Sequence, residues 1–267
     1  MSGAFALPAN PVTQIIEDKL RKQLKAVKRT SMGSEYVAFH ASRDEVIALA
    51  ESDLVSAFRR VVLDPVRGLV MLMTPSGKHE ITSRDMDRFV GCVAALKGIK
   101  TKQLGSTRWR RESDPKNTGN EADCSFYFGQ NAIDCGRAYA RSEAEGDAYT
   151  YRVAPDLVVE VELTHKSKEK YLSYRDKGVV EFWQLNARGK TVAATFLDLQ
   201  AQPDPLEVDT SINLPDLKPA HVIEFIQKWS KEALSYLEYY EVVRYLLEDN
   251  KDALRIREEA AEYEFAS

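Results

Sequence analysis

The fold of this chain is decided by residues 154–163, which read APDLVVEVEL. The nearly continuous Val and Leu run is typical of a strand that is covered on both faces, and it predicts a strand over Leu157–Leu163. Side chains alternate along a strand, so Glu160 and Glu162 share one face while Val159 and Val161 point the other way, into a core. An ionised carboxylate in such an apolar strand is costly unless something compensates it.

A second strand, predicted over Asp123–Phe128, opens with another acid. A Mg²⁺ or Mn²⁺ ion held by Asp123, Glu160 and a backbone carbonyl would supply the compensation, because hard cations take oxygen ligands. Two other interpretations fit the same pattern. The glutamates would then lie on a solvated edge of the sheet, or pair with Arg or Lys. The pattern alone leaves all three open.

The neighbouring segments predict a mixed α/β sandwich with helices packed on one sheet. A β-hairpin is expected from Val61–Leu63 and Leu69–Met73, around a turn at 64–68. Helical spacing predicts a helix over His79–Lys97. Residues 129–152 are polar and are expected to form an irregular surface insertion. The remaining expected elements are a helix from the N-cap Ser167 to Lys177, closed by Gly178, and strands over Val179–Leu185 and Thr191–Leu197.

The two ends of the chain are expected to be helical. Ile15–Val27 reads as a short basic helix, more often a solvated face than a phosphate contact, and residues 43–58 as a second helix. Residues 219–264 are expected to be helical, with an apolar stripe that either covers the sheet or forms a homodimer contact. The stripe consists of Tyr236, Leu237, Tyr240, Val243, Leu246 and Leu247. The predicted division is an N-terminal helical arm (1–57), a core (58–200) and a linker with a C-terminal helical extension (201–267).

Composition describes an ordinary globular chain of 267 residues, 44% hydrophobic and 29% charged. Three cysteines without zinc-ligand spacing predict reduced thiols in a cytoplasmic protein. Neither a signal peptide nor a membrane span is expected. The net charge of −4 is concentrated in residues 231–267, which hold ten acids against five bases, so the rest of the chain is nearly neutral. This balance permits a nucleic-acid partner without indicating one.

Several ordered blocks resemble the Uma-two family, which is assigned to the PD-(D/E)xK nuclease superfamily. They are residues 73–80 (MTPSGKHE), 105–112 (GSTRWRRE), 121–123 (EAD), 154–167 (APDLVVEVELTHKS) and 171–183 (YLSYRDKGVVEFW). The resemblance covers roughly residues 58–200. It implies a restriction-endonuclease-like core, a mixed sheet flanked by helices, with the N-terminal arm and C-terminal helical extension outside it.

The resemblance also assigns acidic residues to roles. Asp123 takes the place of the superfamily's aspartate, a metal ligand, although Ala122 stands where a proline usually precedes it. Glu160 takes the place of the second acidic ligand. Glu80 matches the acid of the first core helix, with His79 beside it.

One position departs from the superfamily pattern. Glu162 stands where typical members have a lysine, and it places negative charge close to where a phosphate would dock. In this family a basic residue on the following helix stands in, and Lys170 is the matching position. Lys170 lies four residues before Tyr174, so the two share one helical face.

The resemblance implies a metal-dependent endonuclease that hydrolyses phosphodiester bonds, expected to be those of DNA, with Mg²⁺ or Mn²⁺ as cofactor. Arg108, Arg110 and Arg111 lie in a basic segment, 97–116, and are expected to contact phosphates. A polar edge strand explains that segment equally well. The alternatives are a catalytically inactive protein of this fold that binds nucleic acid or protein, and a structural dimer joined by the C-terminal helices.

Overall fold

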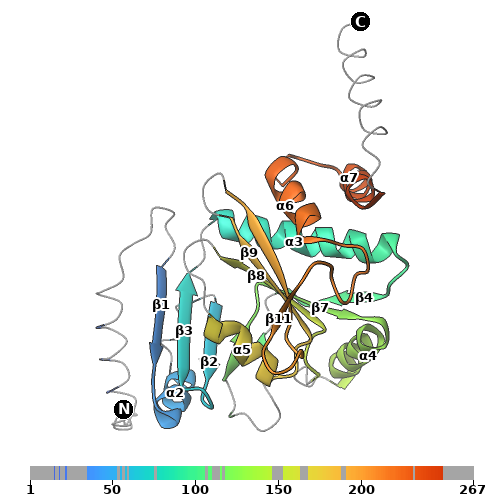
Figure 1. Cartoon of the computed structure of the whole chain (residues 1–267). Coiled ribbons are helices and arrows are strands. Elements are labelled where there is room, and N and C mark those ends of the chain that lie inside the picture. The colour runs from blue at the N-terminus through green and yellow to red at the C-terminus, as the bar shows by residue number, and fades with distance from the viewer. Residues whose placement is uncertain are drawn as a thin grey trace, which may run out of the picture.

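The structure is a computed structural model that describes residues 35–52, 55, 58, 60–74, 77–105, 108–109, 115, 118–145, 153–162, 168–187, 191–230 and 232–248, together with 15, 18 and 22. Within this part, two β-sheets stand side by side, with one helix between them (Figure 1). The α/β class expected from the sequence is confirmed.

The first sheet contains the predicted hairpin at its centre. Its strand order is β1-β3-β2-β6-β5, and all neighbours are antiparallel. The bounds are β1 Glu35–His40, β2 Arg60–Asp64, β3 Leu69–Thr74, β5 Arg108–Trp109 and β6 Gly119–Glu121. Gly68 closes the hairpin turn with a φ of +62°, and a Cβ there would lie 2.4 Å from the carbonyl oxygen of Ala41. Only glycine fits such a position without a shift of the backbone.

The second sheet has the order β11-β10-β9-β8-β7-β4. β8 and β9 are parallel, and the other neighbours are antiparallel. The bounds are β4 Thr101–Gln103, β7 Cys124–Phe128, β8 Leu157–Glu162, β9 Glu181–Asn186, β10 Ala193–Asp198 and β11 Leu206–Val208. Every residue of β8 is buried, as its Val and Leu run predicts.

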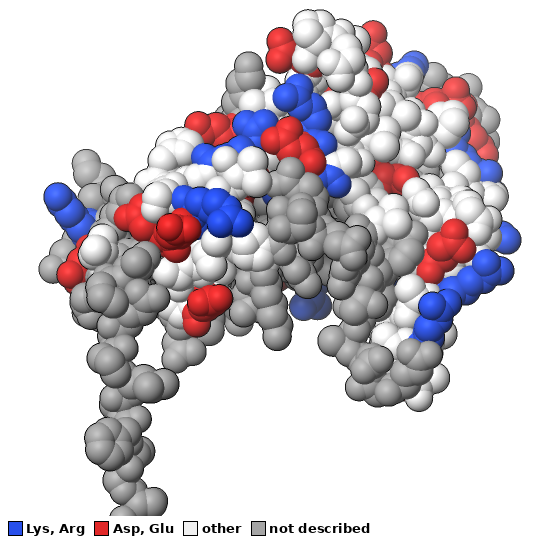
Figure 2. All heavy atoms as spheres, turned by 90° about the horizontal axis from the view of Figure 1, so that it is seen from below, with Lys and Arg blue, Asp and Glu red and all other residues white. Residues whose placement is uncertain are grey.

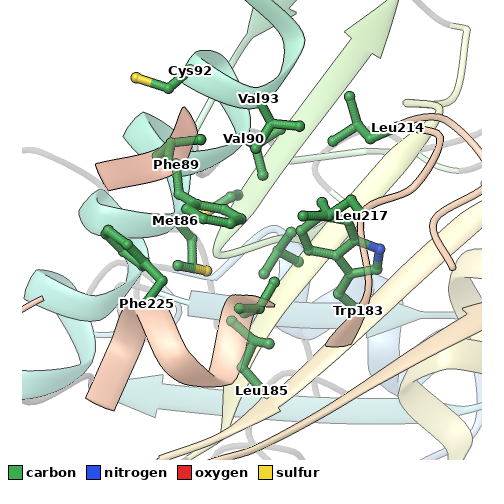
Figure 3. Packing of buried hydrophobic residues seen from close by; sticks show 14 of the residues in the cluster. Met86, Phe89, Val90, Cys92, Val93, Trp183, Leu185, Leu214, Leu217 and Phe225 are labelled. Atoms are coloured by element: carbon green, nitrogen blue, oxygen red, sulfur yellow. The ribbon is translucent and has the colours of Figure 1, made fainter. Parts of the chain in front are cut away.

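Helices cover both faces of this second sheet. The helices are α2 Arg43–Ala50, α3 Gly77–Leu96, α4 Gly129–Glu145, α5 Lys168–Asp176, α6 Pro219–Lys228 and α7 Tyr236–Glu248. On one face, α3, α6 and α7 share the largest buried cluster with β8 and β9. Figure 3 shows Phe89 of α3 and Phe225 of α6 near Trp183 and Leu185 of β9. On the other face, Tyr174 of α5 packs with Val158 and Phe182.

A buried polar network ties α5 to the first sheet. Ser173 Oγ donates a hydrogen bond to Asp64 of β2 and accepts one from Asn120 Nδ2 of β6 at 3.0 Å. Lys177 Nζ lies 3.1 Å from Asp64 Oδ2 and 2.9 Å from Ser173 Oγ. Burial raises the pKa of Asp64, but Lys177 and the hydrogen bonds outweigh burial and leave it below its ordinary value. The network therefore fixes the helix that carries Lys170.

Several expectations about secondary structure are wrong. The helix expected over residues 43–58 ends at Ala50, and the one expected over 219–264 is interrupted between Lys228 and Tyr236. Residues 129–145 form the helix α4 instead of an irregular insertion, because Ala132 and Cys135 bury one face while polar residues cover the other. The prediction of a helical arm over residues 1–57 is wrong at Glu35–His40, because these residues form the strand β1. In β1, buried Val37 and Phe39 alternate with exposed neighbours, a period of two that requires a strand. The basic helix expected over Ile15–Val27 lies almost entirely outside the described residues.

The C-terminal helices cover the sheet, which is one of the two roles expected for them. The buried residues of α7 are Tyr239, Val242, Val243 and Leu246. The stripe is thus rotated from the predicted one, which leaves Tyr236 and Leu237 75% and 76% exposed. Residues 249–264 of the expected helix lie outside the described residues. Among the described helices, none combines the length and hydropathy that crossing a bilayer requires.

Candidate functional site

The sheet register places two of the predicted carboxylates opposite each other. Cys124 of β7 pairs with Val159 of β8 in antiparallel register, so Asp123, one residue earlier, faces Glu160. Directly opposite residues on neighbouring strands present their side chains on the same face. Both carboxyl groups are buried, and a side-chain hydrogen bond links them.

Asp123 lies in a cationic and polar pocket built by three other elements. Its Oδ1 accepts a hydrogen bond from Arg60 Nε of β2 at 3.0 Å. Its Oδ2 accepts one from the backbone N–H of Val161 at 2.7 Å and lies 3.1 Å from Nε2 of His79, in the first turn of α3. Burial acts to raise the pKa of Asp123, but His79, Lys170 and Arg60 outweigh burial and hold it well below its ordinary value.

Glu160 is held from the opposite side by α5. Lys170 Nζ lies 2.5 Å from Glu160 Oε2, and the Tyr174 hydroxyl donates to Oε1 at 2.7 Å. Lys170 and Tyr174 are one helical turn apart, which is the shared face that the sequence predicted. Complete burial raises the pKa of Glu160 well above its ordinary value; Asp123 raises it further, and Lys170 opposes both.

The pKa values of the two carboxyl groups are therefore shifted in opposite directions, since the environment favours ionisation of Asp123 and protonation of Glu160. Two adjacent carboxylates cannot easily both ionise without added positive charge. Lys170 supplies part of that charge. Burial alone lowers the pKa of an ammonium group, yet the interactions with Glu160 and Asp123 raise the pKa of Lys170 above its ordinary value.

The other two predicted acids flank this pair. Glu80 is 28% exposed in its side chain and is joined to the site by Arg60, whose Nη2 lies 3.2 Å from Glu80 Oε1. Glu162 follows Glu160 on the same face and accepts a hydrogen bond from Gln184 Nε2 of β9 at 2.9 Å. All the predicted acids and Lys170 therefore gather at one place between the two sheets.

The donor set permits a hard divalent cation but does not enclose one. Within the part of the chain that the structure describes, no group of three or more His, Cys, Asp and Glu side chains is arranged to hold a metal ion. Magnesium, however, is usually held by one or two carboxylates together with water and substrate phosphates. A carboxylate offers about four lone-pair sites, of which Lys170 and Tyr174 use two on Glu160. Arg60, His79 and the Val161 N–H already occupy three sites on Asp123, so a Mg²⁺ or Mn²⁺ ion would take the remaining sites of Glu160 and a single one on Asp123.

The interpretation that the carboxylates pair with Arg or Lys also describes the geometry, because Arg60 contacts Asp123 and Lys170 contacts Glu160. These contacts show that the pair has counter-charges of its own.

The predicted phosphate contacts fall at the limit of what the structure describes. The backbone of Arg108 forms β5 opposite Glu121, whereas its side chain, Arg110 and Arg111 lie outside the described residues. Elsewhere in the basic segment, Lys97 pairs with Asp216 at 3.2 Å and Lys102 lies over the ring of Tyr139. On the face in Figure 2, the described basic and acidic side chains are interspersed and form no continuous basic band.

Sequence reasoning did not identify three residues of the site. Arg60 opens a strand with no local signal of its role, and Tyr174 was expected only as a neighbour on the face of Lys170. The third, Asp87 of α3, has a pKa of about 6, because burial raises it more than Cys124, Arg60 and Arg84 lower it. Its spacing from His79, two turns along the helix, is the one signal that could have found it.

A scan of the chain against protein-family models found no match, and a search of curated proteins found none either.

Proposed function

We propose that this chain is a divalent-metal-dependent endonuclease of the PD-(D/E)xK type that hydrolyses phosphodiester bonds of DNA. The observation that carries the proposal is the pairing of Asp123 with Glu160 across β7 and β8, with Lys170 against Glu160. A buried pair of carboxyl groups with oppositely shifted pKa values is a frequent mark of a functional site.

The order of elements supports a restriction-endonuclease-like core. A helix, α3, precedes the antiparallel strands β4, β7 and β8; the helix α5 then leads to β9, parallel to β8. Glu160 lies on β8, Asp123 immediately precedes the neighbouring strand β7, and the lysine lies on the following helix, an order that agrees with the resemblance to the Uma-two family. Helices pack on both faces of this sheet, so the strands that carry the two acids are held in place.

Asp123 and Glu160 would hold the cation, which when bound supplies Lewis acidity toward a phosphate oxygen and lowers the pKa of water. Arg60 and His79 orient Asp123, while Tyr174 orients Glu160. Lys170 stays protonated and so can offset negative charge that develops on the phosphate.

The test is incubation of supercoiled plasmid with the protein and Mg²⁺ or Mn²⁺, beside the Asp123→Asn variant purified in parallel. Metal-dependent nicking or linearisation by the wild type and its loss in the variant are expected. Cleavage that persists unchanged in the variant comes from a contaminant and removes the support for an enzyme.

A second candidate is an inactive protein of the same fold that binds nucleic acid. It is favoured by Glu162 in the position of the usual lysine and by the counter-charges already present on the pair. Binding of duplex DNA that weakens steeply with salt, without cleavage at any metal concentration, would select this candidate. Absence of binding at low salt would remove it.

A homodimer through the C-terminal helices belongs to the proposal as well. Its contact surface would include the exposed side chains Tyr236 and Leu237, at the start of α7. Leu237→Lys should then shift the protein from dimer to monomer in sedimentation experiments. A wild type that sediments as a monomer contradicts the dimer.

A further inference from the structure

A buried carboxyl group of α3, Asp85, lies outside the site described above. It follows Ser83 by two residues, about 200° around the helix, whereas the carbonyl of Ser83 faces Cys124 of β7. Asp85 thus belongs to the opposite flank of α3. There it lines an open pocket of about 1020 Å³ between α3, α6 and the segment that follows β9.

One oxygen of the Asp85 carboxyl group, Oδ2, has no hydrogen-bond donor among the described residues. The residue is 8% exposed, and its Oδ2 is buried without a hydrogen-bond partner. Arg88 lines the same pocket and lowers the pKa of Asp85, but burial is the larger effect and raises that pKa to about 6. A buried acceptor without a donor destabilises a folded protein, and a ligand that donates a hydrogen bond to it would remove that cost.

The pocket is lined by aliphatic and polar side chains together, and its charged residues are Asp85, Glu232, Lys78 and Arg88. Aliphatic surface comes from Ile81 of α3, Ile226 of α6 and Val192, which precedes β10, and Ile81 is largely exposed. Lys78 lies at the rim, with its Nζ donating to the carbonyl of Ala187 at 2.7 Å. A ligand that fits combines an aliphatic body with a head that donates hydrogen bonds to a carboxylate.

We propose that this pocket binds a small organic cation, an ammonium or guanidinium group on an apolar stem, with Asp85 as the counter-ion. A charged donor is favoured over a neutral one because hydrogen bonds between ionised groups are about twice as strong. The site is separate from the Asp123–Glu160 pair, so it stands whether or not the chain cleaves DNA.

The test compares two probes with the same apolar body, n-hexylamine and 1-hexanol, by ¹H–¹⁵N NMR titration of the full chain. Hexylamine should bind with a dissociation constant on the order of a millimolar and at least about tenfold more tightly than hexanol. The shifted amides should cluster at the pocket-lining residues of α3, between Lys78 and Arg88, and at those between Ile226, near the end of α6, and Ala233. This localisation needs no variant and so holds even if a substitution disturbs folding.

Two variants assign the contact. Asp85→Asn keeps the shape of the side chain and should weaken hexylamine about tenfold while leaving hexanol unchanged. Glu224→Gln, on α6 but in a surface ion pair with Lys228, should leave both affinities unchanged. Equal affinities for the two probes, shifts scattered away from the pocket, or full hexylamine affinity in Asp85→Asn would each overturn the proposal.

Discussion

Two glutamates, Glu160 and Glu181, are completely buried on the adjacent parallel strands β8 and β9, yet their surroundings differ. Glu181 accepts hydrogen bonds from neutral donors: Trp183 Nε1 at 2.6 Å, Ser211 Oγ at 3.1 Å, and the backbone and side-chain nitrogens of Asn213 at 3.0 and 2.9 Å. Glu160 faces a second carboxyl group and the ammonium of Lys170.

The difference shows that burial of a carboxylate does not by itself indicate function. The donors around Glu181 hold the loop after β11 against the sheet, which is a structural role. Around Glu160, the acidic residues Asp123, Glu80 and Glu162 outnumber the basic residues Arg60 and Lys170. That excess is the feature that a divalent cation would offset.

The largest effect should come from exchanging each glutamate for its amide. Glu160→Gln should lower plasmid cleavage on the order of 10³-fold, because an amide cannot ionise to bind the metal. Glu181→Gln should leave cleavage within about a factor of two and lower the free energy of unfolding by about 1–3 kcal/mol. Equal losses of cleavage in the two folded variants would end the distinction between them.

The buried network of Asp64, Ser173 and Lys177 at α5 is a second place where a buried carboxylate has a structural role. Lys177→Met leaves Asp64 buried without its counter-ion, so we expect a loss of about 3 kcal/mol in the free energy of unfolding. The control is Lys228→Met, which breaks an exposed ion pair with Glu224 and should cost less than about 0.5 kcal/mol. Urea denaturation measures both; similar small losses would mean that the network does not fix α5.

Asp87 sharpens the comparison through pH. Its pKa in the folded chain, about 6, lies above the ordinary value of 3.8. Its contribution to stability is therefore present in full below the ordinary pKa and is lost as the pH rises through about 6. Asp87→Asn removes this loss and should stabilise the protein by about 1–2 kcal/mol near pH 8, with little change near pH 4. A pH-independent effect in urea denaturation would contradict this assignment.

The smallest expected effect concerns Glu162, which adds negative charge beside the pair. Glu162→Gln keeps a hydrogen bond to Gln184 but removes the charge, so DNA affinity at low salt should rise about threefold to tenfold. Fluorescence anisotropy with a labelled duplex measures it. An unchanged affinity would mean that phosphate does not approach Glu162.

Much of the fold follows from local patterns in the sequence. The Val and Leu run predicts β8, the alternation of side chains places Glu160 and Glu162 on one face, and the helical spacing predicts α3. The helix α4 was not predicted because its sequence is polar and its burial depends on β4 and β7. Helix propensity is a weak signal where tertiary packing determines whether a segment becomes helical.

The site was predictable only in its acidic half and in Lys170. Arg60 lies 63 residues before Asp123, and Asp64 lies 109 residues before Ser173. Contacts over such separations arise from the packing of the two sheets, which no local period encodes. Because of the same packing, Asp123 is surrounded by Arg60 and His79 and is not exposed to solvent.

The most direct test of the central claim is calorimetric titration of the protein with Mn²⁺ and Mg²⁺. One ion per chain should bind to the wild type and to Glu181→Gln, and this binding should be lost in Asp123→Asn and in Glu160→Gln. A wild type that binds no ion, or an Asp123→Asn variant that binds it unchanged, would contradict a metal centre at this carboxylate pair.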